Sequence, residues 1–262
     1  MKPVSVISLL NWDASRYLEN LLANLDAFSP GGIYHLRILD QGSEPETKKL
    51  LKEYVTGKSH VSVEFLSKNI GYSAGHNYNF ATVSKNLDFQ YFVTINNDVL
   101  FGATDWLKMM VSAMEAYSSA AVGGPTCWKV YPTYIKPANR VQKEAGDYLF
   151  VGGSVAIIRV SAVRRFGLFD EVYTPAYWED ADLCLRYVHF GMRQIWIDVP
   201  FVHGYLGNAG SVNQEKHREL EAEYGDFRMR NERLLSDRWV TNRSKYPVEA
   251  QLSNEFPRLY IP

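Results

Sequence analysis

Residues 90–99 organise the chain, because an apolar, aromatic and β-branched run ends abruptly in polar residues. A run without polar alternation is typical of a strand buried on both faces, as in a parallel sheet. Asn96, Asn97 and Asp98 are therefore expected at the carboxyl end of that strand. Ligands of open α/β sheets bind outside this edge, which makes Asp98 a candidate ligand for a metal or a phosphate-bearing substrate. The same residues are equally suited to turning the chain, because Asn and Asp bond their own backbone.

Three strand–helix units precede this run. Each combines a buried-type strand with a helical segment. Such repeats predict an α/β fold with a doubly wound, mostly parallel central sheet, right-handed crossovers and flanking helices. The predicted strands are residues 4–10, 35–39 and 61–66, and the predicted helices are 15–28, 45–54 and a segment that ends near Val83.

Polar residues stand where each of these strands ends. Asn11 follows the first strand, Asp40 follows the second, and Asn69-Ile70-Gly71 follows the third. The chain contains neither the GxGxxG fingerprint of dinucleotide sites nor the GxxxxGK[ST] of a P-loop. The N-terminal half therefore resembles a nucleotide-binding half-fold in which other groups must hold the nucleotide.

The second half of the chain has a less regular pattern. Residues 125–147 contain prolines and tyrosines without clean periodicity, which predicts a long connection. Such a connection is the natural element to contact a second substrate, the acceptor. A strand at 150–159 leads into a short helix at 161–166, with Ser161 as its expected cap. The other predicted elements are a helix at 106–117, a strand at 120–124, a helix at 180–190 and a strand at 193–202.

Three acidic residues, Glu179, Asp180 and Asp182, crowd the start of the predicted helix at 180–190, which Gly191 is placed to cap at its other end. Two interpretations of Asp180 stay open on this pattern alone. Acidic residues at a helix start cap free N–H groups and complement the macrodipole. A carboxylate at this place can also act in catalysis.

His203 follows the predicted strand at 193–202. A single histidine is more often a structural residue than a ligand. The strands before Asp98 and His203 are both expected in one sheet, so the two side chains can converge on one cation.

Composition excludes several classes of protein. With 28 Lys and Arg against 29 Asp and Glu, the net charge of −1 disfavours a nucleic-acid partner. Cys127 and Cys184 form no metal-binding spacing, which fits a reducing compartment without structural zinc. No apolar run approaches the ~18 residues of a membrane span, and no signal peptide precedes Val4, so a cytoplasmic protein is expected.

A basic stretch near the C-terminus qualifies that expectation. Residues 228–245 contain six basic and two acidic residues, a local excess of +4 (6 − 2). Such a stretch is usually a solvated face, but it also suits anionic lipid, a pyrophosphate or an acidic partner. The arginines available for peripheral contact with the inner face of a membrane are Arg228, Arg230, Arg233 and Arg238.

Taken together, these segments resemble the family-2-type inverting glycosyltransferases of the GT-A fold, especially the bacterial branch with rhamnosyl- and galactosyltransferases. The resemblance runs from Val4 to about Ser211, with a weaker echo near Asn231. Each piece is common alone, but their order matches that of the family. The matching pieces are Asn11, Asp40-Gln41-Gly42-Ser43, Asn69-Ile70-Gly71 with Asn77, Asn96-Asn97-Asp98, Phe169-Asp170-Glu171, the stretch 179–186 and His203.

The resemblance implies a role for each of these residues. Asp40 would contact the base or ribose of a nucleotide sugar, and Asp98 and His203 would hold Mn²⁺ or Mg²⁺ on its diphosphate. Asp180 would be the catalytic base, with Glu179 beside it. The remaining residues expected at the nucleotide are Leu10, Asn11, Ser43, Asn69, Gly71, Asn77, Asn96 and Asn97.

One position departs from the family pattern. The fuller metal motif is Asp-x-Asp, whereas this chain has Asn96 first, and an amide binds a hard cation more weakly than a carboxylate. Weaker metal binding with retained activity is expected, and Asp98 must carry more of the site.

The implied function is hexosyl or deoxyhexosyl transfer, with inversion, from a UDP- or dTDP-sugar to a hydroxyl of a growing glycan or glycolipid. Residues 1–211 would form the GT-A domain, with a nucleotide-binding half at 1–98 and an acceptor half at 99–211. Residues 212–262 would be a helical extension on the acceptor side, packed on the same domain.

Two alternatives stay open. A nucleotidyltransferase shares a similar sheet but favours a glycine-rich N-terminal loop with a basic residue, which residues 9–13 do not provide. A catalytically inactive sugar-nucleotide-binding or scaffold protein finds support only in Asn96. Hydrolysis of a sugar nucleotide in the presence of metal separates an enzyme from a scaffold.

Overall fold

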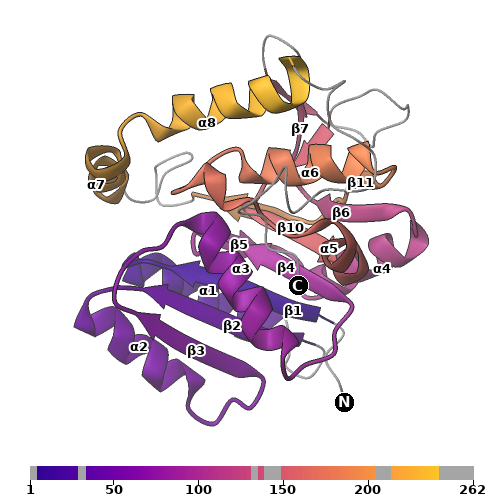
Figure 1. The fold of residues 1–262 in the computed structure, drawn as a ribbon. Coiled ribbons are helices and arrows are strands. Elements are labelled where there is room, and N and C mark those ends of the chain that lie inside the picture. Colours follow the sequence, from indigo (N-terminus) through magenta and orange to yellow (C-terminus); the bar gives the residue numbers. More distant parts are fainter. Residues whose placement is uncertain (1–4, 29–33, 131–134, 139–148, 205–213, 242–262) are drawn as a thin grey trace.

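The structure, a computed structural model, describes residues 5–28, 34–130, 135–138, 149–204 and 214–241. A central sheet lies between two layers of helices (Figure 1). Its seven strands are β1 (Ser5–Asn11), β2 (Tyr34–Gln41), β3 (Val61–Leu66), β4 (Tyr91–Ile95), β6 (Ala120–Gly124), β10 (Val155–Arg159) and β11 (Arg193–Trp196).

The strand order is β11-β6-β10-β4-β1-β2-β3. β1 is parallel to β2 on one side and to β4 on the other, and β3 is parallel to β2. β10 is antiparallel to both β4 and β6, whereas β11 is parallel to β6. The predicted mostly parallel α/β sheet is therefore confirmed, with one reversed strand that the sequence pattern did not indicate.

Helices cover both faces of this sheet. α1 (Ser15–Phe28), α2 (Pro45–Val55) and α4 (Trp106–Ala116) pack on one face, and α3 (Tyr72–Ser84), α5 (Val160–Phe166) and α6 (Glu179–His189) pack on the other. Val6 of β1 packs in the core on the α3 side, and Ile7 packs in the core on the α1 side. Because successive residues of a strand point to opposite faces, one apolar strand contributes to both cores.

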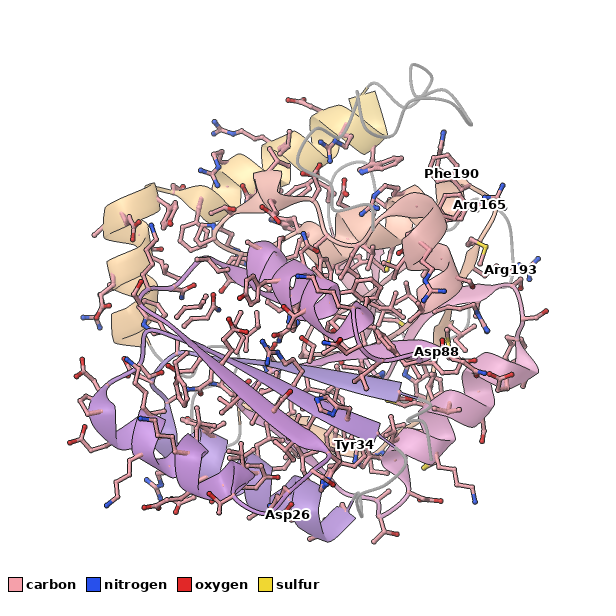
Figure 2. All side chains as sticks on the ribbon, turned by 60° about the horizontal axis from the view of Figure 1, so that its bottom comes forward. Asp26, Tyr34, Asp88, Arg165, Phe190 and Arg193 are labelled. Atoms are coloured by element: carbon pink, nitrogen blue, oxygen red, sulfur yellow. The ribbon has the colours of Figure 1, made fainter. Side chains whose placement is uncertain are left out.

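Side chains fill the space between the sheet and the helix layers (Figure 2). Arg165 of α5, Phe190 at the end of α6 and Arg193 of β11 lie toward one end of that view, and Asp26 of α1 lies toward the other. α5 begins at Val160 with Arg159 as its N-cap and without a capping side chain. The predicted Ser161 cap is therefore wrong, because Ser161 lies inside the first turn.

The segment predicted as one strand at 150–159 is divided between two sheets. β9 (Leu149–Val151) joins β7 (Cys127–Val130) and β8 (Ile135–Ala138) in a three-stranded sheet, and β10 enters the central sheet. Gly153 lies at the break, where an added Cβ would be 2.7 Å from the Tyr72 hydroxyl oxygen. The predicted long connection at 125–147 thus contains two strands, and its residues 131–134 and 139–147 lie outside the described residues.

The predicted strand at 193–202 is divided in the same way. β12 (Phe201–His203) leaves the central sheet and pairs antiparallel with β5 (Val99–Phe101). The register places His203 opposite Val99, the residue after Asp98. The expectation that Asp98 and His203 follow strands of one sheet is wrong, but the small two-stranded sheet brings them together instead.

The C-terminal segment is helical and packs on the α6 side. A 3₁₀ turn, η1 (Glu171–Tyr173), precedes α6, and α7 (Gln214–Tyr224), α8 (Phe227–Ser236) and a π-helix, η2 (Asp237–Thr241), follow β12. α8 runs above α6 in Figure 1, and Leu235 and Trp239 are buried in the same core cluster as α6. Residues 205–213 and 242–262 lie outside the described residues. Across the described ranges, no helix is both long enough and apolar enough to cross a membrane.

Candidate active site

The carboxyl ends of β1, β2 and β4 bring polar side chains together at one edge of the sheet. Asn11 Nδ2 donates to Asp40 Oδ2 at 3.1 Å and to Ser43 Oγ at 3.2 Å. Asn97 Nδ2 donates to Asn11 Oδ1 at 3.0 Å. Asp40 is fully buried, and its second oxygen accepts the backbone N–H of Ser43 at 3.2 Å. These bonds fix the orientation of the Asn11 amide, because its donors and its acceptor each have a partner.

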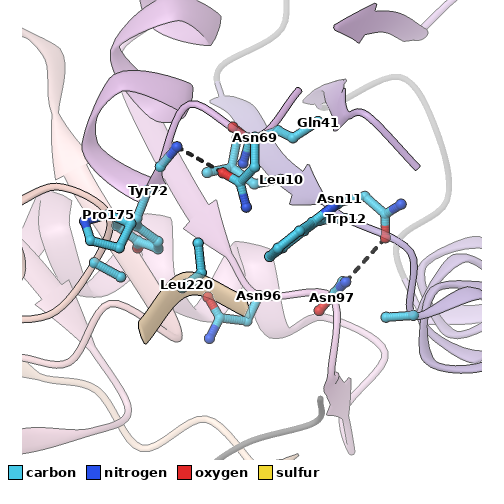
Figure 3. Close-up of a pocket in the computed structure, with 13 residues that line it drawn as sticks. Leu10, Asn11, Trp12, Gln41, Asn69, Tyr72, Asn96, Asn97, Pro175 and Leu220 are labelled. Carbon is cyan, nitrogen blue, oxygen red and sulfur yellow. Dashed lines mark hydrogen bonds between the residues drawn. The ribbon is translucent and has the colours of Figure 1, made fainter. Parts of the chain in front are cut away.

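A pocket of about 210 Å³, the edge pocket, opens beside these residues (Figure 3). Most of the residues predicted to contact a nucleotide line it, and the others lie behind them. The predicted residues that line the edge pocket are Leu10, Asn11, Asn69, Gly71, Asn96 and Asn97.

Asp40, Ser43 and Asn77 do not line the edge pocket. Asp40 and Ser43 hold Asn11, while Asn77 bonds the backbone N–H and C=O of Phe169, at 3.1 Å and 2.9 Å. The predicted direct contact between Asp40 and a base or ribose has no support in this geometry, because the Asp40 side chain is fully buried and does not line the pocket. Asp40 and Ser43 thus support a residue that lines the pocket, whereas Asn77 fixes the backbone of Phe169, which does not line it.

Other lining residues were not predicted. Trp12 and Gln41 directly follow Asn11 and Asp40, so the ends of the same strands indicated their place. Leu220 comes from α7, and nothing in the sequence pattern indicated it. Gly71 has φ +90°, and a Cβ there would lie 2.9 Å from the Pro175 carbonyl oxygen, so this close approach requires glycine.

Asp98 and His203 meet beside the edge pocket. Asp98 Oδ1 lies 3.2 Å from His203 Nε2, and the Asn96 amide nitrogen lies 3.4 Å from the same ring nitrogen. Two adjacent ligands of an octahedral cation, each about 2.1 Å from it, are about 3.0 Å apart, so the Asp98–His203 spacing fits a shared cation. Within the described residues no three His, Cys, Asp or Glu side chains form a metal cluster. A cation here would depend on this pair, the Asn96 amide and oxygens of the substrate.

A larger cavity of about 720 Å³, the central cavity, adjoins the edge pocket and shares Tyr72, Asn96, Asn97 and Ala176 with it. Asp98 lines the central cavity from the connection between β4 and β5, and His203 lines it from β12. Glu179 and Asp180 line the same cavity from the first turn of α6. One space therefore contains both the candidate cation ligands and the candidate base.

Backbone N–H groups hold the Asp180 carboxylate. Gly153 N–H donates to Asp180 Oδ2 and Ala181 N–H donates to Oδ1, both at 2.8 Å. Burial raises the pKa of Asp180, and these N–H bonds lower it only in part, so the pKa stays above its ordinary value. The expectation that the helix start alone keeps this group readily ionised is therefore incomplete, because burial opposes it.

Glu179 has a different environment from its neighbour. Its Oε2 atom is buried and has no hydrogen-bond partner among the described residues. Burial and the adjacent charge of Asp180 raise the pKa of Glu179 well above its usual range. Asp180 is therefore the first of the pair to ionise, and Glu179 retains its proton to higher pH.

Asp182 is directed away from the central cavity. Its Oδ1 atom accepts from Tyr173 Oη at 3.1 Å, from Arg238 Nη1 at 2.8 Å and from Trp239 Nε1 at 2.8 Å. Burial favours a higher pKa for Asp182, but Arg238 and Arg186 outweigh it and lower the pKa. Of the three acids at the start of α6, Glu179 and Asp180 line the cavity, because neighbouring positions of a helix point to different faces.

The four arginines predicted to contact a membrane have four different environments. Arg228 lines the central cavity, and Arg230 bonds the Asn231 side chain at 3.0 Å. Arg233 is exposed on α8. Arg238 is buried against two carboxylates, at 2.8 Å and 3.0 Å, so the prediction of membrane contact is wrong for this residue.

The sequence matches Glycosyl transferase family 2 over residues 10–172, and the chain belongs to this family. The matched range includes the carboxyl end of β1, the strands from β2 to β10 and the Asn96-Asn97-Asp98 turn. No curated protein matches the chain.

Solved structures show the same GT-A fold. The mannosyltransferase PcManGT from Pyrobaculum calidifontis, in complex with GDP-Man and Mn²⁺, is 15% identical with a TM-score of 0.58, over 75% of this chain and 55% of that one. GalNAc-T7 with UDP, GalNAc and Mn²⁺ is 10% identical with a TM-score of 0.65, over 99% and 55% of the two chains. S. aureus TarS 1-349 is 14% identical with a TM-score of 0.55, over 77% and 59%. The chain thus spans somewhat more than half the length of these structures, and the likeness concerns the fold.

Proposed function

We propose that this protein transfers a sugar from a nucleoside-diphosphate sugar to an acceptor hydroxyl, with inversion at the anomeric carbon. One observation supports this most strongly: Asp98, His203 and Asp180 line a single cavity that adjoins a pocket of amide side chains. A departing diphosphate needs positive charge beside it, and an acceptor hydroxyl needs a base that takes its proton. The Asp98–His203 pair suits the first, and the Asp180 carboxylate suits the second.

The nucleoside is assigned to the edge pocket. Asn69 and Asn97 provide amide groups there, the Asn11 Oδ1 atom has one further lone pair for a donor, and Trp12 provides an aromatic face. Bases and ribose present both donors and acceptors, which such a set can bind. A UDP- or dTDP-sugar is the proposed donor, while PcManGT and GalNAc-T7 were solved with GDP-Man and with UDP.

The donor diphosphate is assigned to the mouth of the central cavity, next to Asp98 and His203. A divalent cation bound by this pair and the Asn96 amide would neutralise charge on the departing phosphate oxygens. His203 would contribute a ring nitrogen to this cation and Asp98 a carboxylate oxygen. Through the cation, both residues would hold the diphosphate in place relative to the cavity. With the single carboxylate of Asp98, the site has less negative charge for a cation than the usual Asp-x-Asp motif.

Asp180 receives the proton of the acceptor hydroxyl. The acceptor oxygen attacks the anomeric carbon, the bond from that carbon to the diphosphate oxygen breaks, and the hydroxyl proton passes to the Asp180 carboxylate. A single displacement of this kind inverts the anomeric centre. Because Glu179 keeps its proton to higher pH, Asp180 is the ionised member of the pair.

A thermal-shift screen tests this proposal. UDP-, dTDP- and GDP-sugars are added with Mn²⁺ or Mg²⁺, and a donor at 100 times its Kd adds about 2.7 kcal/mol of stability. We expect at least one donor to raise the melting temperature with metal and to lose that effect with EDTA or in Asp98→Ala. A donor that stabilises the protein but is not hydrolysed in the presence of metal would favour the inactive binding protein. Stabilisation by nucleoside triphosphates, screened in parallel, and by no sugar nucleotide would favour a nucleotidyltransferase.

A further inference from the structure

The loop before α6 holds two consecutive residues in a left-handed backbone conformation. Tyr177 has φ +74° and Trp178 has φ +78°, and neither is a glycine. Such a conformation costs about 1–3 kcal/mol per residue and persists only where surrounding contacts impose it. Both residues line the central cavity. The strain is therefore located where substrate would lie.

α8 imposes this conformation. Asn231 is fully buried, and its Nδ2 donates to the carbonyl oxygens of Tyr173 at 3.0 Å, Ala176 at 2.9 Å and Tyr177 at 3.3 Å. Trp178 Nε1 donates to the Arg228 carbonyl oxygen at 3.2 Å. The loop cannot move away without breaking the hydrogen bonds from the buried Asn231 amide to these three carbonyl oxygens, so the amide holds it in place.

The wall formed by this loop is aromatic and carries one positive charge. Phe150 lies 6.4 Å from Trp178, centroid to centroid, and the Arg228 guanidinium lies 5.6 Å from the Tyr177 ring. Among the described residues lining the cavity, Arg228 is the sole Lys or Arg. The ion pairs found within the described part of the chain do not include Arg228. Its charge thus faces the cavity without a carboxylate partner there.

We propose that Phe150, Tyr177, Trp178 and Arg228 form the acceptor subsite, and that this subsite takes a sugar bearing an anionic group, a phosphate or a carboxylate. The proposal rests on the proposed glycosyl transfer. Aromatic walls with few placed polar groups are typical of specific ligand sites, and the apolar face of a sugar ring fits such a wall. A guanidinium binds carboxylate and phosphate oxygens in a bidentate manner. The donor diphosphate already has the Asp98–His203 cation site, which leaves Arg228 for the acceptor.

Matched sugar probes test the charge preference. Methyl glucoside, methyl glucuronide and glucose 1-phosphate, and the corresponding galactose compounds, are titrated by NMR against protein saturated with nucleoside diphosphate and Mg²⁺. We expect at least one anionic probe to bind about tenfold more tightly than its neutral counterpart, as charge-assisted bonds require. The carboxylate and phosphate arms identify which anion is preferred. No preference in either arm, including no binding at all, overturns the proposal.

Variants of α8 assign the preference to one side chain. Arg228→Ala should abolish it, Arg228→Lys should retain part of it, and Arg233→Ala, an exposed residue of the same helix outside the cavity lining, should leave it unchanged. A preference that persists in Arg228→Ala contradicts the assignment.

Donor binding distinguishes this proposal from the one on which it rests. Arg228→Ala should retain wild-type affinity for nucleoside diphosphate, and a loss of that affinity would assign Arg228 to the donor and overturn the acceptor proposal. If wild-type protein binds no nucleotide sugar or nucleoside diphosphate, the proposed function itself fails, whatever the sugar probes show.

Discussion

Glu179 and Asp180 are adjacent in the chain but differ in what surrounds their carboxyl groups. Asp180 accepts two backbone N–H bonds, whereas Glu179 Oε2 has no partner among the described residues. Two buried carboxyl groups in contact do not ionise together, because each charge disfavours the other. The environment therefore supports Asp180 as the proposed base and favours the retained proton on Glu179.

Activity should depend on pH through Asp180. Because burial raises its pKa above the ordinary value of 3.8, kcat/KM should fall as pH decreases through a point above that value. Asp180→Asn should lower kcat by roughly 10²–10⁴ and leave donor affinity nearly intact. Steady-state kinetics with Glu179→Gln as control measure both effects. Near-normal turnover in Asp180→Asn would show that the residue only binds the Gly153 and Ala181 N–H groups and is not the base.

Stability should depend on pH through Glu179. A carboxyl whose pKa is raised in the folded state favours folding at low pH, and this contribution is lost as pH rises through the raised pKa. The melting temperature of Glu179→Gln, relative to wild type, should therefore increase from pH 5 to pH 9. Each kcal/mol corresponds to about 2–4 °C at this chain length. A difference that is constant over this pH range would contradict the assignment.

Asp40 should act on the donor through Asn11. Asp40→Ala removes the acceptor that orients the Asn11 amide, so donor KM should rise while kcat is preserved. A double-mutant cycle measures the coupling: the Asp40→Ala, Asn11→Ala double variant should cost little more than Asn11→Ala alone. Additive effects would instead indicate that Asp40 contacts the donor directly, and an unchanged KM in Asp40→Ala would remove it from donor binding.

α8 and η2 connect the C-terminal segment to α6, the helix that carries Glu179 and Asp180. Arg238 of η2 pairs with Asp182 of α6 and with Asp170 before η1, and all three side chains are buried. The same segment holds the Tyr177–Trp178 loop through Asn231. The conformation of the cavity wall therefore depends on residues more than 50 positions away in the chain.

Arg238→Ala should destabilise the fold by about 3–5 kcal/mol, because it leaves buried Asp170 without its cation and removes one of the two arginines beside buried Asp182. Urea unfolding measures the change, and Arg233→Ala, an exposed arginine of α8, should stay within about 0.5 kcal/mol of wild type. Equal stability of the two variants would show that the buried network contributes little.

The sequence pattern predicted the elements whose signal is local and missed those that tertiary contacts define. β4 and the ends of β1 and β2 could be predicted because buried parallel strands are apolar without interruption. The division of 150–159 at Gly153 could not, because the Tyr72 side chain that approaches it lies far away in sequence. Leu220 and the Arg238 network were missed for the same reason. Hydrophobic periodicity reports burial but not which distant element covers a face.

At the scale of the whole molecule, two adjoining spaces at one edge of the central sheet are lined by different chemical groups. The edge pocket is lined by amide side chains of residues 11–97, and the central cavity adds two acids and an aromatic wall from residues 150–180 and an arginine from α8. Asp98 and His203 lie where the two spaces meet. The sequence analysis predicted that these two side chains converge. The two-stranded sheet of β5 and β12 brings them together, instead of the single sheet that was predicted.

Release of free nucleoside diphosphate from UDP-, dTDP- and GDP-sugars, with and without Mn²⁺ or Mg²⁺, tests the central claim most directly. We predict metal-dependent release from at least one donor by wild-type protein, accelerated by acceptor and lost with EDTA, in Asp98→Ala and in His203→Ala. Arg233→Ala should match wild type in the same assay. Absence of release from all three donors, or release that is unchanged by EDTA and by both substitutions, would contradict a metal-assisted glycosyl transfer at Asp98 and His203.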